Sequence, residues 1–163
     1  GKYLRRSWAN ADDVEARVQC MFAATVAGMA FSNSSVALVH GMARPIGALF
    51  HVSHGRSNAA LLPAVMEYSL VGCPDRFARV AEAMGECTQG LSEMGAAKKS
   101  VDAVRALCED VKIPRIGELG IDPAKFMEVA PKMAADALAS GSPNNNPRIP
   151  SKDEIVELYR ALL

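Results

Sequence analysis

All three histidines of this 163-residue chain, His40, His51 and His54, fall within fifteen positions. Neutral imidazole is the commonest metal ligand and a frequent acid/base group, so the cluster points to a site for chemistry. His40 and His54 could converge on a single cation if the chain turns between them, which would make them metal ligands. The alternative is a buried histidine satisfied by a backbone carbonyl. The spacing alone favours that alternative, whereas the clustering in a mostly apolar segment favours a metal.

Two neighbours in the same segment, Arg44 and His51, are candidates for lining a pocket. Arg44 follows His40 by one helical turn and therefore shares its face. It could anchor an anionic cofactor or substrate group, or form an exposed salt bridge. Gly47, Ser53 and Gly55 favour a loop around His51, which could line the pocket, donate to a substrate oxygen or cap a helix. No residue stands out as a certain catalytic acid or base, and we take Arg44 and His54 as the candidates for cofactor binding.

The histidines supply only part of the ligands that a metal site needs. A catalytic metal needs about three protein ligands and an open position, yet no Asp or Glu lies between Glu15 and Glu67. The chain also carries no glycine-rich dinucleotide or phosphate motif, no Gly-x-Ser-x-Gly and no Cys-x-x-Cys pair. Half of a metal site is therefore visible in the sequence.

Composition narrows the class of protein. Lys plus Arg and Asp plus Glu both number 18, so the net charge is zero and nucleic acid is not an expected partner. The longest apolar run is too short for a membrane span, and we expect no membrane partner. The four cysteines are scattered and look like reduced thiols of a cytoplasmic protein. The chain opens at Gly1 without a Met, which we interpret as processing, a tag or excision from something longer.

The elements that must position these residues all read as helices. Apolar residues recur at helical spacing from 14 to 29 after a capping-type start at Asp12 and Glu15. The serine cluster 32–35 predicts a break and an N-cap for a second helix carrying His40, with a kink before Phe50 caused by Pro45 and its neighbouring glycines. Further helices are predicted near 61–70, 77–84, 101–111, 123–139 and 151–162. Asp122 before Pro123 is the predicted N-cap of the penultimate helix, and Ser151 with Glu154 is a predicted capping box that opens the last one. Pro131 is expected to kink or divide the penultimate helix, and residues 140–150 are expected to form a loop. Four methionines are expected in the core: Met21, Met29, Met42 and Met66. No segment alternates with period two, so we predict an all-α helical bundle that forms one domain over residues 1–163.

Several segments together resemble the iron-containing (group III) alcohol dehydrogenases. They are Ala27-Gly-Met-Ala-Phe31-Ser-Asn33, Leu38-Val-His40-Gly-Met-Ala, His54-Gly-x-x-Asn58-Ala, Leu61-Leu-Pro63, Asn146-Pro-Arg148, Asp153-Glu-Ile155 and Tyr159. The resemblance covers essentially the whole chain.

The resemblance implies a function and a missing part. Members are about twice as long and have a dehydroquinate-synthase-like architecture, an N-terminal NAD(P)-binding domain followed by an all-helical metal-binding domain. This chain matches the later part of the helical domain, so its own N-terminal domain is an expected partner. The family's ligands are an Asp and a His on an earlier helix plus two histidines that match His40 and His54. The implied cofactors are Fe²⁺ or Zn²⁺ and NAD or NADP, the implied substrate is a small alcohol or aldehyde, and a homodimer or larger assembly is expected.

One position departs from the family pattern. Many relatives carry a second His four residues after the first ligand, where this chain has Arg44. An arginine stays charged and cannot shuttle protons, whereas His51 has no counterpart among the family ligands and could compensate.

Two classes of function remain open. One is the metal-binding part of an NAD(P)-dependent alcohol dehydrogenase, inactive on its own, and the other is a stand-alone, non-catalytic helical binding or assembly module.

Overall fold

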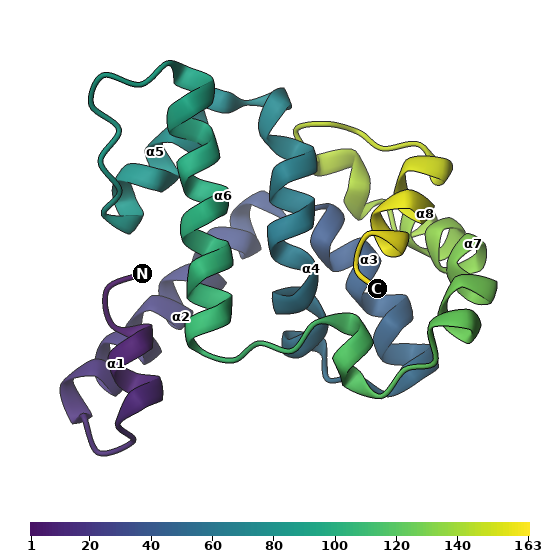
Figure 1. Ribbon diagram of the computed structural model, residues 1–163, viewed down its shortest axis with the longest axis horizontal. Helices are drawn as coiled ribbons and strands as arrows, with labels where there is room; N and C mark the ends of the chain where they lie inside the picture. The colour runs from purple at the N-terminus through teal and green to yellow at the C-terminus, as the bar shows by residue number, and fades with distance from the viewer. The chain divides into compact units, whose positions relative to one another are not determined.

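The computed structural model describes all 163 residues, which form α-helices and short 3-10 turns without a β-strand (Figure 1). The predicted all-α fold is therefore confirmed. The chain divides into two compact units, residues 1–35 with 74–112 and residues 36–73 with 113–163. That they make up one domain stays a prediction. None of the helices, taken singly, has the length and apolar composition that spanning a membrane requires.

The first unit contains α1 (Leu4–Ala9), α2 (Val14–Ser34), α5 (Pro74–Met84) and α6 (Glu93–Asp110). Helix α1 packs against α2, and α5 packs against α6. An ion pair of 2.5 Å between Arg5 and Asp110 connects α1 to the end of α6. The buried face of α6 consists mainly of small residues: Ala96, Ala97, Ser100, Val101, Ala103 and Val104.

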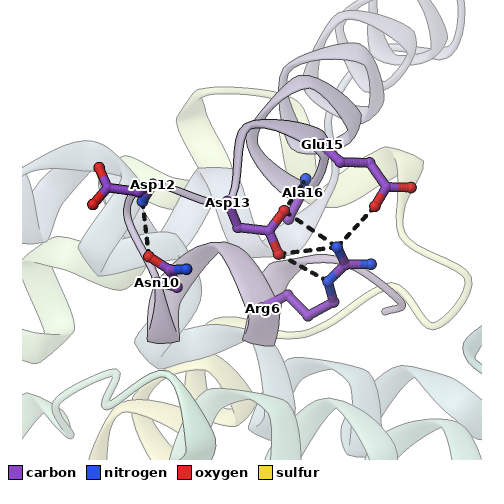
Figure 2. Close-up of polar contacts among 6 residues, drawn as sticks. All are labelled: Arg6, Asn10, Asp12, Asp13, Glu15 and Ala16. Carbon is purple, nitrogen blue, oxygen red and sulfur yellow. Dashed lines mark hydrogen bonds and ion pairs between the residues drawn. The ribbon is translucent and has the colours of Figure 1, made fainter.

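Helix α2 starts one residue later than the sequence pattern predicts. Its N-cap is Asp13, whose carboxylate accepts a 3.0 Å hydrogen bond from the backbone N–H of Ala16, as Figure 2 shows. Arg6 of α1 donates to Asp13 and, at 2.8 Å, to Glu15, fixing the turn between the two helices. The Ala16 amide and the Arg6 guanidinium hold the pKa of Asp13 below its ordinary value.

The second unit contains α3 (Leu38–Phe50), α4 (His54–Ser69), α7 (Pro123–Ala139) and α8 (Lys152–Arg160), with 3-10 turns η1 (Leu70–Gly72), η2 (Ile116–Leu119) and η3 (Ser142–Asn145). Helix α3 packs against both α4 and α7, and α7 packs against α8. Tyr159 of α8 is fully buried, and its hydroxyl donates to the carbonyl oxygen of Met42 in α3 at 2.8 Å. The ring of Phe126 lies edge-on to Tyr159, 5.6 Å between centroids. The helices that carry His40 and His54 thus rest on one apolar core: Leu38, Met42, Ile46, Leu61, Val65, Phe126, Met133, Ile155 and Tyr159.

The serine cluster does not cap the helix that follows it. Helix α2 continues to Ser34, and the side chains of Ser32, Asn33 and Ser34 donate back to carbonyl oxygens one turn earlier. The N-cap of α3 is Ala37, which offers no side-chain hydrogen bond. The predicted N-cap role was wrong because these short polar side chains bond to the preceding helix.

Helix α7 runs unbroken through Pro131. Of the two outcomes predicted for Pro131, division of the helix is wrong and a kink stays a prediction. Pro45 likewise lies inside α3, and the kink predicted there stays a prediction. The caps predicted for α7 and α8 are confirmed, with Asp122 accepting from the Ala124 amide and a capping box between Ser151 and Glu154.

The prediction that four methionines lie in the core holds only for Met42. Met42 is fully buried and Met66 half-buried, whereas Met21 and Met29 of α2 are 71% and 64% exposed. Helix α2 buries only Ala16 among its 21 residues, so its periodic apolar side chains do not form a core within this chain.

Candidate metal centre

His40 and His54 lie together in the second unit. His40 is in the first turn of α3 and His54 is the first residue of α4. The loop formed by residues 51–53 reverses the chain, so that α3 packs against α4. The centroids of the two imidazole rings are 5.3 Å apart and the ring planes are inclined by 53°. The side chains of His40 and His54, fourteen residues apart in the sequence, thus lie close together in space.

This spacing suits two ligands of one cation. At metal–nitrogen distances of about 2.1 Å and tetrahedral angles, two ligating imidazoles have their centroids about 5 Å apart. Imidazole nitrogen is a donor that suits Fe²⁺ and Zn²⁺. The chain brings together no group of three or more His, Cys, Asp and Glu side chains able to hold a metal. The two histidines therefore fit a half-site, and their role as ligands stays a prediction.

The surroundings favour a neutral His40. Its pKa is lowered, first by burial and then by the nearby His54 and Arg44 charges. A lower pKa leaves more of the ring unprotonated at neutral pH, and only the unprotonated ring binds a metal. His54 is exposed, which leaves one side of the pair open to an incoming group.

Arg44 has a structural partner. Its guanidinium donates to the hydroxyl of Ser142 at 3.4 Å, linking α3 to η3, while the residue as a whole is exposed. Arg44 is close enough to His40 to lower its pKa, as the shared helical face predicts. Its proposed binding of a cofactor stays a prediction.

His51 ends α3 as its C-cap in a left-handed conformation, with φ of 56°. Its backbone N–H donates to the carbonyl of Gly47 at 3.1 Å. The residue is exposed and precedes α4, so the predicted loop between His51 and His54 is confirmed. A role of His51 in a pocket stays a prediction.

Asn58 is the residue that the sequence analysis did not single out. It lies one turn after His54 on α4, and its amide nitrogen is 3.0 Å from His54 Nε2 and 2.9 Å from the His54 carbonyl oxygen. Its own Oδ1 is buried without a hydrogen-bond partner. The signal was available in principle, because positions i and i+4 meet on a helix.

Comparisons with known proteins agree with the fold. The family model described as Fe-containing alcohol dehydrogenase family, C-terminal, matches residues 1–163. The 1,3-propanediol dehydrogenase of Citrobacter freundii is 41% identical over 158 residues, covering 96% of this chain and 40% of that protein. Lactaldehyde reductase of Escherichia coli K12 is 39% identical over 150 residues, covering 91% of this chain and 38% of the relative.

Solved structures give the same result. The crystal structure of a 1,3-propanediol oxidoreductase superposes with a TM-score of 0.94 at 37% identity, over 99% of this chain and 42% of the other. An alcohol dehydrogenase from Oenococcus oeni gives 0.91 at 40% identity, over 99% and 41%. The chain spans about two fifths of the length of these relatives. It belongs to the iron-containing alcohol dehydrogenase family, a family of oxidoreductases, and corresponds to the C-terminal part of its members.

Proposed function

We propose that this chain is the metal-binding C-terminal part of an NAD(P)-dependent alcohol dehydrogenase or aldehyde reductase. The observation that carries the proposal is the 5.3 Å separation of the His40 and His54 rings, which matches two ligands of one divalent cation. When bound, Fe²⁺ or Zn²⁺ supplies Lewis acidity toward an alcohol or carbonyl oxygen, and the nicotinamide exchanges a hydride with the adjacent carbon. The remaining ligands and the nucleotide site belong to the rest of the longer protein.

The residues of this chain have distinct tasks in the proposed site. His40 and His54 each offer one imidazole nitrogen, and the lowered pKa of His40 keeps its ring available. Arg44 places a permanent positive charge near His40, where an anionic group of a cofactor or substrate would be attracted. Relatives named for 1,3-propanediol and lactaldehyde support small alcohols and aldehydes as the substrate class.

A titration of Zn²⁺, measured by calorimetry, tests the proposal in this chain and in the product of the longer reading frame that includes it. We expect weak binding to the chain and tight, stoichiometric binding to the longer protein. His40→Ala or His54→Ala should weaken binding by more than about 100-fold in the longer protein, since loss of a ligand exceeds the 10–100-fold cost of losing a supporting contact. His51→Ala is the matched control and should leave the affinity unchanged. Unaltered affinity in both ligand variants would overturn the assignment.

A second candidate function is a non-catalytic helical binding or assembly module. It is favoured by one observation, the lack of a third metal-binding side chain next to His40 and His54. The same titration separates the candidates, because a module that does not bind metal would give no tight site in the longer protein. Turnover of NAD(P) with small alcohols in that protein would exclude the module.

A further inference from the structure

Asn58 makes two contacts with a single neighbour, His54. Its amide nitrogen donates to the His54 backbone carbonyl oxygen at 2.9 Å and lies 3.0 Å from the ring nitrogen Nε2. The other amide atom, Oδ1, is buried and has no partner. The amide is thus held by its nitrogen alone.

The first contact fixes which way the amide faces. A carbonyl oxygen only accepts hydrogen bonds, and of the two amide atoms only the nitrogen donates. Turning the amide over would place Oδ1 against the carbonyl oxygen of His54, where two acceptors repel. The amide nitrogen therefore stays beside His54.

The second contact then fixes the protonation of the ring. Because the amide nitrogen has no lone pair to offer, His54 Nε2 must be the acceptor of that hydrogen bond. An accepting nitrogen carries no proton, so the proton of the neutral ring is on Nδ1. The helix itself sets this arrangement, because His54 and Asn58 are four residues apart on α4.

We propose that Asn58 fixes the neutral tautomer of His54, with the lone pair on Nε2, and that a divalent cation binds at Nε2 by displacing the Asn58 amide. The first part concerns the free chain and stands alone; the second rests on the metal-binding function proposed above. Asn58 is thus a positioning residue that determines which nitrogen is the ligand. It also competes for that nitrogen, because its hydrogen bond must break when a cation binds.

Nitrogen-15 NMR of the imidazole rings tests the tautomer. With three histidines in the chain, His40→Ala and His51→Ala assign the signals. In the neutral ring we expect His54 to show an unprotonated Nε2 and a protonated Nδ1. In Asn58→Leu, the Nε2-protonated form should increase, and Asn58→Ala serves as a second variant if Leu disturbs the fold. A protonated Nε2 in the unaltered chain would overturn the proposal.

Zn²⁺ titration of the same substitutions made in the longer protein, where the full ligand set is expected, tests the competition. Losing the amide should strengthen binding by about three- to tenfold, the effect of removing one hydrogen bond that opposes the cation. Asn33→Leu is the matched control, because the Asn33 amide nitrogen also donates to a carbonyl one turn back, that of Met29, without an imidazole beside it. Equal or weaker binding by the Asn58 variants would contradict displacement at Nε2. If the tautomer changes as expected while no sample binds Zn²⁺, the proposed metal function fails and the effect of Asn58 on His54 remains.

Discussion

At the level of single residues, the carboxylate of Glu154 contacts both the backbone of Ser151 and the side chain of Arg148. It accepts from the Ser151 backbone N–H at 2.8 Å and pairs with Arg148 at 2.6 Å. The Arg148 guanidinium lies over the ring of Tyr68 in α4, 4.0 Å from its centroid. These contacts, the Ser151 amide first and then Arg148, lower the pKa of Glu154 from 4.5 to about 2. The contact chain connects the start of α8 to α4, the helix that begins with His54.

Glu154→Gln should make the free energy of unfolding less dependent on pH between 4.5 and about 2. A lowered folded-state pKa means that the unfolded chain takes up the proton first, so the contribution is complete above pH 4.5 and is lost as the pH falls toward about 2. Glutamine can still accept from the Ser151 amide, so the capping box is retained while the charge is removed. Denaturation curves over this pH range should show the stability difference between the two proteins shrinking on acidification. Glu157→Gln, which removes a carboxylate paired with Arg160 on the same helix, is the control; a constant difference for Glu154→Gln would contradict the prediction.

The break between α2 and α3 carries the clearest backbone strain among the elements. Ser35 has φ of 64° and ψ of −175°, a region that is essentially open only to glycine and costs another residue about 1–3 kcal/mol. The side chain of Ser35 therefore works against the conformation that separates the helix ending at Ser34 from the helix carrying His40.

Ser35→Gly should raise the free energy of unfolding by about 1 kcal/mol. Glycine relieves the backbone strain of about 1–3 kcal/mol, but its greater freedom in the unfolded chain takes back about 0.5–1 kcal/mol. Ser34→Gly, one residue earlier and still helical, is the control. It should lower stability by about 0.5–1 kcal/mol, since glycine is unfavourable in a helix and the bond from Ser34 to the Ala30 carbonyl is lost. Urea unfolding of the three proteins checks the opposite signs. A fall in stability for Ser35→Gly would show that the serine is not strained.

The elements also show what sequence can and cannot predict. The capping box at Ser151 and the cap at Asp122 were predictable because each is a local contact within one turn. The end of α2 was not, since a serine that bonds backward to its own helix has the same composition as one that caps the next. For the site, the clustering of His40 and His54 was visible, but their proximity depends on the packing of α3 against α4. The contact from Asn58 is local, and its i, i+4 spacing from His54 on a helix makes it predictable from the sequence.

For the molecule as a whole, the unusual feature is that helix α2 exposes nearly all of its apolar side chains. These residues lie on all sides of the helix, and only Ala16 is buried. Helices that are apolar all round are normally buried inside a larger protein, and a continuous exposed apolar surface marks an interaction site. The chain spans about 40% of the length of the 1,3-propanediol dehydrogenase relative, and we predict that a surface outside this chain packs on α2. The strongly exposed side chains of α2 are Val14, Val18, Met21, Phe22, Val26, Met29 and Phe31.

The isolated chain should therefore associate with itself through α2. We expect light scattering coupled to gel filtration to give a mass above that of one chain, rising with concentration, because burying these side chains against a second copy removes apolar surface from water. Replacing Phe22 and Met29 together with Gln should shift the chain toward monomer. Ile149→Gln is the matched control, since Ile149 is 64% exposed but lies outside α2. A monomer of unchanged mass at every concentration would contradict the prediction. The longer protein should lose this dependence on Phe22 and Met29 if its additional residues cover α2, so the pair of measurements distinguishes an internal surface from an interface between copies.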